Sequence, residues 1–230
     1  PTGMDYDCQR NGVWVTSGAS EDLVMLDPVS GLVVKTITMT GKVIGTDENS
    51  MDAAVLDNGN LLLTNWNGDG VTIGTYLYEF NPDTETLVNY WPLDGTWNTS
   101  TDGSSISLIR GVEMMFEPFR RAYLTRSDDN YVYEVQLTPG KPGTWKTLAV
   151  HAPPSLLNST CIDKVACYED TPITGYVIAD RNTTVINFYN DNFTLNSNFD
   201  AQHGTHAGNY GVTIVPGNPA KLWVSDYDSG

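Results

Sequence analysis

The chain has 230 residues, enough to bury a large core in one or two domains without help from metal ions or disulfides. Its 28 acidic and 12 basic residues give a formal net charge of −16, so repulsion argues against nucleic acid or an anionic lipid surface as a partner. No apolar run reaches the roughly 18 to 20 residues needed to cross a bilayer, which argues against membrane insertion. With 21 Gly and 12 Pro, the composition is that of a turn-rich globular protein.

A short apolar run that ends in a small residue, followed by a polar one, recurs five times along the chain. The small residues are Thr16, Thr64, Thr125, Ala179 and Ser225. Another apolar run and a turn precede four of the copies, at 53–56, 112–116, 165–168 and 212–215, and alternating strands follow the first four. Four strands per unit, with no stretch of helical period, predicts an all-β propeller of about five four-stranded blades.

The repeat units fall at about 11–39, 51–93, 111–150, 163–199 and 211–230, and we expect them to form one domain over residues 1–230. The first unit lacks a recognisable inner strand, and the last stops after two strands. Either the two ends of the chain meet in a shared fifth blade with an irregular strand from residues 1–12, or the sequence is an excerpt of a larger propeller. Unpaired strands at such ends predict self-assembly or partner binding through blade edges.

The units resemble blades of known propeller families. The segment from Asp57 to Asn65, followed by Leu77-Tyr78-Glu79-Phe80-Asn81-Pro82, and the segment Trp14-Val15-Thr16, followed by Leu26-Asp27-Pro28, are similar to blades of NHL-like, gluconolactonase-like and arylsulfotransferase-like propellers. The gluconolactonase-like resemblance implies a metal held by Glu, Asn and Asp at the channel mouth, but the early Glu-x-Pro motif is absent. The arylsulfotransferase-like resemblance implies a catalytic histidine.

Loops after the second strand of each blade and the links between blades are expected on one face, around the channel, so candidate site residues are sought there. Asn65, Asn67 and Asp69 resemble the opening of a calcium loop, whose continuation fails because Ile73 and Tyr76 stand where acids are needed. A Gly-rich turn is the alternative. Asp180 and Asp226 follow their second strands at equivalent places and are the other candidate metal ligands.

His203 and His206 form the only His-x-x-His pair, and with Asp226 they could chelate a metal or carry acid-base catalysis. The alternative is a loop with two hydrogen-bonding histidines. Cys161 and Cys167 are close enough in sequence for a short disulfide, with Cys8 left over; inert free thiols are the alternative, and the Cys-x5-Cys spacing disfavours zinc. We expect no required cofactor, with calcium as the exception to test.

Asn-x-Ser/Thr sequons occur at Asn98, Asn158, Asn182 and Asn192. Combined with the acidic composition and the predicted disulfide, they indicate a secreted, N-glycosylated protein. Aromatic residues near loops, such as Trp66 and Tyr131, could stack on sugars. The sequence therefore predicts a structural or recognition module that binds protein or glycan. The alternative is an extracellular metal-assisted hydrolase or transferase, lactonase-like or arylsulfotransferase-like, with its site at the propeller mouth.

Overall fold

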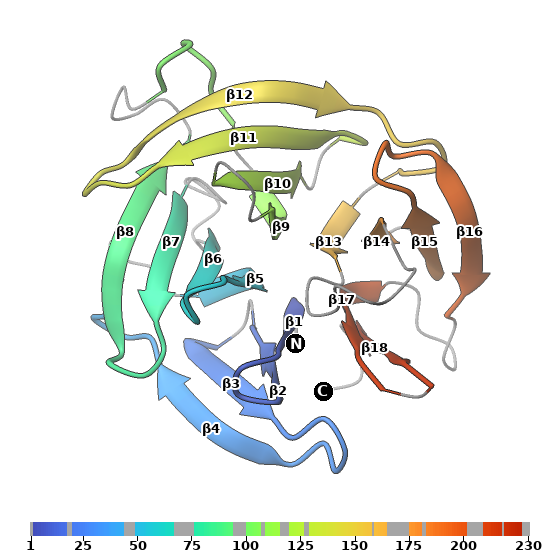
Figure 1. The fold of residues 1–230 in the computed structure, drawn as a ribbon, viewed down its shortest axis with the longest axis horizontal. Helices are drawn as coiled ribbons and strands as arrows, with labels where there is room; N and C mark the ends of the chain where they lie inside the picture. The colour runs from blue at the N-terminus through green and yellow to red at the C-terminus, as the bar shows by residue number, and fades with distance from the viewer. Residues whose placement is uncertain are drawn as a thin grey trace.

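The computed structural model describes residues 2–17, 20–43, 49–66, 76–93, 100–106, 109–115, 120–126, 129–157, 159–164, 175–180, 183–201, 209–217 and 219–226. These residues form strands and turns and no helix, so none of the described segments is a helix able to cross a membrane. The strands make five antiparallel sheets arranged radially around an axis (Figure 1).

Each of the first four sheets has four strands in chain order from the axis outward. The first contains β1 (Met4–Asp7), β2 (Gly12–Val15), β3 (Asp22–Leu26) and β4 (Val33–Thr38). The second contains β5 (Asn49–Val55), β6 (Leu61–Trp66), β7 (Tyr76–Asn81) and β8 (Thr86–Pro92). The third contains β9 (Ile109–Met115), β10 (Arg121–Arg126), β11 (Val132–Thr138) and β12 (Thr144–His151). The fourth contains β13 (Ser159–Asp163), β14 (Tyr176–Asp180), β15 (Val185–Tyr189) and β16 (Leu195–Asp200).

The fifth sheet has two strands, β17 (Asn209–Val215) and β18 (Lys221–Asp226). The inner strand of each sheet contacts that of the next, and β17 also contacts β1, so the five inner strands surround the axis. The predicted all-β propeller is confirmed, with four four-stranded blades and a two-stranded sheet rather than five full blades. This arrangement also fits the alternative of an excerpt of a larger propeller.

Neighbouring blades pack face to face through apolar side chains. Trp14 and Leu23 of the first sheet share a core cluster with Leu61 and Phe80 of the second. The cluster between the second and third sheets contains Trp91 and Trp145. The indole N–H groups of these two tryptophans reach backbone carbonyls of the opposite sheet: Trp91 Nε1 donates to the Thr138 carbonyl at 2.8 Å, and Trp145 Nε1 donates to the Pro92 carbonyl at 2.9 Å.

The repeated small residues lie in or directly after the second strands, where three of them have a specific task. The Thr16 hydroxyl accepts the Gly3 N–H at 3.0 Å, the Thr64 hydroxyl accepts the Asp52 N–H at 3.0 Å, and the Thr125 hydroxyl accepts the Gly111 N–H at 3.1 Å. The ladders between β5 and β6 and between β9 and β10 are irregular at this level. A threonine hydroxyl therefore takes the place of a missing backbone acceptor.

Two inner strands differ from the sequence-based expectation. The irregular strand expected within residues 1–12 is β1, and it is the inner strand of the first sheet rather than part of a fifth blade; two of its four residues are aspartates, so its sequence lacks the apolar pattern of the other inner strands. In the fourth sheet the inner strand is β13 at Ser159–Asp163, whereas the predicted 165–168 lies outside the described residues. The run Val165-Ala166-Cys167-Tyr168 is more apolar than Ser159–Asp163, and the prediction was based on that apolar pattern.

Candidate functional site

The most distinctive chemical feature near the axis is a set of four buried carboxylates, one from each of the first four inner strands. They belong to Asp5, Asp52, Glu113 and Asp163, none of which is more than 8% exposed. Each accepts a hydrogen bond from a backbone N–H of the next sheet around the ring. The donors are Val55 for Asp5, Val112 for Asp52 at 2.9 Å, Lys164 for Glu113 at 3.1 Å and Ile214 for Asp163 at 3.0 Å.

These bonds follow from the geometry of an inner strand. One edge of the strand pairs with the second strand of its sheet, while the other faces the axis, where no strand lies beside it. The N–H groups on that edge are buried and need acceptors. A carboxyl oxygen from the preceding sheet accepts a hydrogen bond from one of these N–H groups and so ties one blade to the next.

The strand register places three of the carboxylates at one level along the axis. Asp5, Glu113 and Asp163 pair with Trp14, Tyr123 and Val177, each two residues before its sheet's small residue. The same level holds Thr213 in β17, opposite Trp223, and Ala54 in β5, opposite Leu62. We call these five residues, Asp5, Ala54, Glu113, Asp163 and Thr213, the acidic layer.

The three carboxylates of the acidic layer converge: their nearest oxygens all lie within 4.8 Å of one another. Burial and the charge of Asp163 raise the pKa of Asp5 well above its ordinary value. Burial and then the charges of Asp5 and Asp163 raise the pKa of Glu113. Burial raises the pKa of Asp163 to about 6. Each charge makes the others harder to form, as expected for like charges in a desolvated site.

A second level of the axis is built from small residues. It contains Gly3, Asp52, Gly111, Cys161 and Gly211, which we call the small-residue layer. A Cβ added to Gly111 would lie 3.0 Å from the Ile162 nitrogen, and one added to Gly211 would lie 3.0 Å from the Thr2 carbonyl oxygen. The inner strands therefore come close to backbone contact at Gly111 and Gly211, where a side chain does not fit without a shift of the neighbouring strand.

Cys161 lies in the small-residue layer as a buried free thiol. Its Sγ donates to Asp52 Oδ1 at 3.4 Å, and burial together with the Asp52 charge raises the pKa of the thiol well above its ordinary value. The predicted Cys161–Cys167 disulfide is therefore wrong, and Cys167 itself lies outside the described residues. Cys8, expected to be the unpaired cysteine, is disulfide-bonded. The prediction relied on the short sequence separation of Cys161 and Cys167, whereas Cys161 lies in β13 and is buried in the core.

Glu79 shows how this fold treats a buried carboxylate that stays ionised. It is 1% exposed, and its oxygens accept hydrogen bonds from the side chains of Asn60 at 2.8 Å and Arg120 at 2.7 Å. Burial alone would raise its pKa, but the donors, Arg120 among them, leave the pKa below its ordinary value. The strongest influences on the acidic layer are burial, its own carboxylates and backbone N–H groups, with no basic side chain among them.

The residues predicted to hold a metal at the mouth have other tasks or lie outside the described segments. Asn65 is buried in β6, and its Oδ1 accepts the Tyr76 N–H at 3.1 Å. Asp180 is fully buried at the end of β14, and its Oδ2 accepts the Leu157 N–H at 2.8 Å. Asp226 ends β18 at the register position equivalent to Asp180, opposite the first residue of its inner strand. Asn67, Asp69, His203 and His206 lie outside the described residues.

His151 ends β12 and packs between the third and fourth sheets. Its Nε2 lies 3.2 Å from Glu134 Oε2, and its ring centroid lies 4.6 Å from that of Phe193. Arg121 holds the other oxygen of Glu134 at 2.8 Å. These contacts describe a packed interface between blades. Among the sequons, Asn192 is exposed in the turn between β15 and β16, and Asn98, Asn158 and Asn182 lie outside the described residues.

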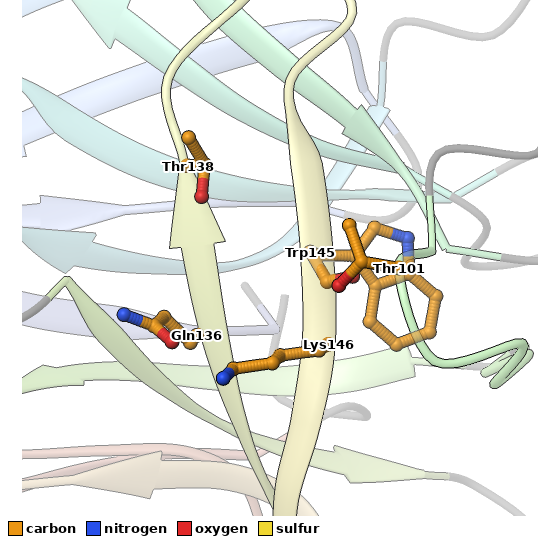
Figure 2. Close-up of a pocket in the computed structure, with 5 residues that line it drawn as sticks. All are labelled: Thr101, Gln136, Thr138, Trp145 and Lys146. Carbon is orange, nitrogen blue, oxygen red and sulfur yellow. The ribbon is translucent and has the colours of Figure 1, made fainter.

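A shallow hollow of about 230 Å³ lies on the outer part of the third sheet (Figure 2). It is lined by Thr101, Gln136, Thr138, Trp145 and Lys146. The backbone N–H of Thr101 donates to the Trp145 carbonyl at 2.8 Å, so this segment covers the edge of β12. The described lining offers hydroxyl, amide, indole and ammonium groups.

The three carboxylates of the acidic layer are not among the site residues predicted from the sequence, although the sequence carries a signal for them. Each carboxylate stands one residue after an apolar residue of an inner strand: Met4, Val112 and Ile162 precede Asp5, Glu113 and Asp163. Aligning the acids by their distance from the small residue of each unit would have placed them at one level. Without that alignment an isolated acid gives no such signal, because Asp and Glu are mostly exposed.

No protein-family model and no curated protein sequence matches this chain. Solved structures match the fold. A glutaminyl cyclase from Myxococcus xanthus aligns with a TM-score of 0.63 at 9% identity, covering 98% of this chain and 91% of that one. A calcium-binding protein, regucalcin, from Agrobacterium tumefaciens aligns with a TM-score of 0.55 at 10% identity, covering 97% and 81%. A streptogramin B lyase aligns with a TM-score of 0.51 at 14% identity, covering 98% and 62%. At these identities the likeness establishes the propeller fold and the blade-level resemblance alone.

Proposed function

We propose that this chain is a non-catalytic extracellular recognition module that binds a protein partner by strand addition to β18. The observation that carries the proposal is the exposure of β18. In the other four sheets the second strand lies between two neighbours and is largely buried; in β14 every residue is buried. In β18 Leu222 and Trp223 are only half-buried, and Val224 is 36% exposed.

The difference has a structural cause. β14 is covered on its outer side by β15 and β16, whereas no described strand lies beyond β18. Within the described residues no strand pairs with the outer edge of β18, and an edge of this kind presents backbone N–H and C=O groups in the geometry that another strand can pair with. An exposed strand edge bordered by apolar side chains is the arrangement that proteins use to bind an extended partner segment.

The other sheets define the chemistry of the segment that fits. β14 and β18 have similar sequences, Tyr176-Val177-Ile178-Ala179-Asp180 and Leu222-Trp223-Val224-Ser225-Asp226. The strand that pairs with β14 is Val185–Tyr189, whose residues Ile186 and Tyr189 are buried. The matching ligand for β18 is therefore a protein β-hairpin rich in branched apolar and aromatic residues. A glycan offers no backbone N–H groups for this ladder, which favours protein over glycan as the partner.

The extracellular part of the proposal rests on the sequons and the acidic composition. Asn192 is exposed in the turn between β15 and β16, where an attached glycan would meet solvent. Expression in a glycosylating host, followed by glycopeptide mass spectrometry, is expected to find glycan on Asn192. An unoccupied Asn192 in secreted material would remove that support.

The edge is tested with a synthetic hairpin peptide of residues 183–200, this chain's own outer strand pair. We expect binding in the micromolar range by fluorescence anisotropy and slower amide hydrogen exchange at Leu222, Trp223 and Val224. Val224→Lys should abolish both effects because the charge stands beside the pairing edge. Val34→Lys is the matched control: Val34 is 59% exposed on β4, the outer strand of a complete blade, and the change should leave binding intact.

Two outcomes contradict the proposal. One is the absence of peptide binding and of protection on β18 at millimolar peptide. The other is turnover of lactone or sulfate-ester substrates that is lost in His203→Ala or Asp226→Ala, which would favour the hydrolase or transferase alternative.

A further inference from the structure

We infer that the acidic layer binds one divalent cation of the calcium class between Asp5, Glu113 and Asp163. These three side chains come from sheets one, three and four, so the ion would hold together segments more than 150 residues apart in sequence (Figure 1). The site is separate from the β18 edge and independent of the function proposed above.

The first argument is unbalanced charge. Three carboxylates are buried with their nearest oxygens within 4.8 Å of one another. Buried carboxylates are stable only when they are protonated, paired with a cation or bound to a metal ion. The nearest basic side chain in sequence, Lys164, points elsewhere: its Nζ lies 3.0 Å from Asp191 and 4.9 Å from the ring centroid of Tyr176.

The second, independent argument comes from the neighbouring hydroxyl in the same layer. Thr213 is fully buried, and its Oγ1 makes no hydrogen bond of normal geometry with any described group. Its hydroxyl lies beside the Asp163 carboxylate, close enough to lower the pKa of that group. Asp163 Oδ1 is also buried without a hydrogen-bond partner among the described residues. The Thr213 hydroxyl thus adds a buried oxygen with a free lone pair beside the three carboxylates of Asp5, Glu113 and Asp163, which we call the triad, and Asp163 Oδ1 offers another from within it.

The spacing fits a hard cation with oxygen ligands. Calcium binds oxygens at about 2.3 to 2.6 Å, so three oxygens spread around one ion lie up to about 4.0 to 4.5 Å apart, whereas magnesium at about 2.0 to 2.1 Å holds them within about 3.6 Å. Three carboxylate oxygens within 4.8 Å can therefore surround a calcium ion with little movement of the strands. The bonds from backbone N–H groups do not compete, since a carboxylate oxygen has two lone pairs.

The experiment measures metal content and affinity on the intact chain. Elemental analysis after dialysis is expected to find about one calcium-class ion per chain, and calorimetry on EDTA-treated protein should show Ca²⁺ binding. Asp163→Asn and Glu113→Gln should each weaken Ca²⁺ binding at least roughly tenfold, because each removes a charged ligand. Asp52→Asn is the matched control, because Asp52 is buried and ties two blades together but lies outside the triad. The Ca²⁺ affinity of this variant should stay within about threefold of that of the parent protein.

Stability gives a second measurement. At one fixed Ca²⁺ concentration, Ca²⁺ should raise the melting temperature of the parent protein and of Asp52→Asn clearly more than that of Asp163→Asn. If the triad variants do not fold, an anomalous difference map from parent crystals soaked in MnCl₂ decides the matter by the presence or absence of a peak between the three carboxylates. Protein that carries no metal and binds none contradicts the inference. Affinity unchanged in both triad variants contradicts it as well.

Discussion

The axis and the rim of this propeller hold their strands in place by different means. At the axis, inner strands from neighbouring sheets touch through backbone, and carboxylates and threonine hydroxyls take up the N–H groups that the ladders leave unpaired. At the rim, the outer strand β4 exposes Val33 and Val34 by 63% and 59%. A substitution should therefore lower the free energy of unfolding more at the axis than at the rim, although both regions belong to the same sheets.

The largest effect is expected for Gly111→Val at the axis. The new Cβ would lie 2.4 Å from the Thr125 hydroxyl oxygen and 3.0 Å from the Ile162 nitrogen, and that backbone cannot move without separating two blades. We expect a loss of about 3 kcal/mol or more in the free energy of unfolding, measured by urea denaturation.

Gly217→Val is the control for that substitution, since Gly217 lies in the exposed turn between β17 and β18, where the nearest atom, the Pro219 carbonyl oxygen, is 3.3 Å away. Its loss should be clearly smaller. Equal losses for the two variants would show that the axis is not the tighter region.

A smaller effect is expected from the titration of Asp163. Its folded pKa is raised from 3.8 to about 6, so the stability that it contributes is fully present below about pH 4 and is lost as the pH rises through 6. In EDTA the total loss from this group is about 3 kcal/mol, spread over that pH range. Carboxylates with lowered pKa, such as Glu79, act in the opposite direction.

The difference between parent and Asp163→Asn isolates the Asp163 contribution. Unfolding free energies measured from pH 4 to pH 7 should fall more steeply with pH in the parent. Parallel curves for the two proteins would mean that Asp163 titrates normally in the folded state.

The blade architecture could be predicted from the sequence more fully than the contacts at the axis. The spacing of Thr16, Thr64 and Thr125 located the second strands because the hydroxyl at this position satisfies a local need in each blade. The meaning of Asp5 and Asp163 could not be found locally, because it depends on strands more than 150 residues apart meeting at one level. The fate of Cys161 was missed for the same reason: its neighbours are Asp52 and Val212, not Cys167.

The two described cysteines extend the comparison to chemical reactivity. Cys161 is fully buried at the axis with a raised pKa, so it should resist iodoacetamide at pH 8 in the folded protein and react fully in urea. Cys8 is exposed and disulfide-bonded, so it should react only after reduction. With Cys161 free, peptide mapping without reductant should find Cys8 linked to Cys167, the one other cysteine of the chain.

Rapid labelling of Cys161 in the native protein would contradict the packed axis. A Cys8–Cys161 link would contradict both the free thiol and the assignment of Cys161 to the small-residue layer.

The smallest effect is expected for Val34→Lys on the rim. Val34 is 59% exposed on β4, and its neighbours Leu32 and Val33 are more exposed still, so the lysine can extend into solvent without leaving a cavity or burying a charge. The free energy of unfolding should change by less than about 0.5 kcal/mol, measured by urea denaturation beside Gly111→Val. A single lysine added to an acidic chain also leaves the net charge well below zero, so solubility should not change. A loss above that limit would mean that the outer strand is held by contacts as specific as those of the axis, and the two regions would then differ in chemistry but not in tolerance.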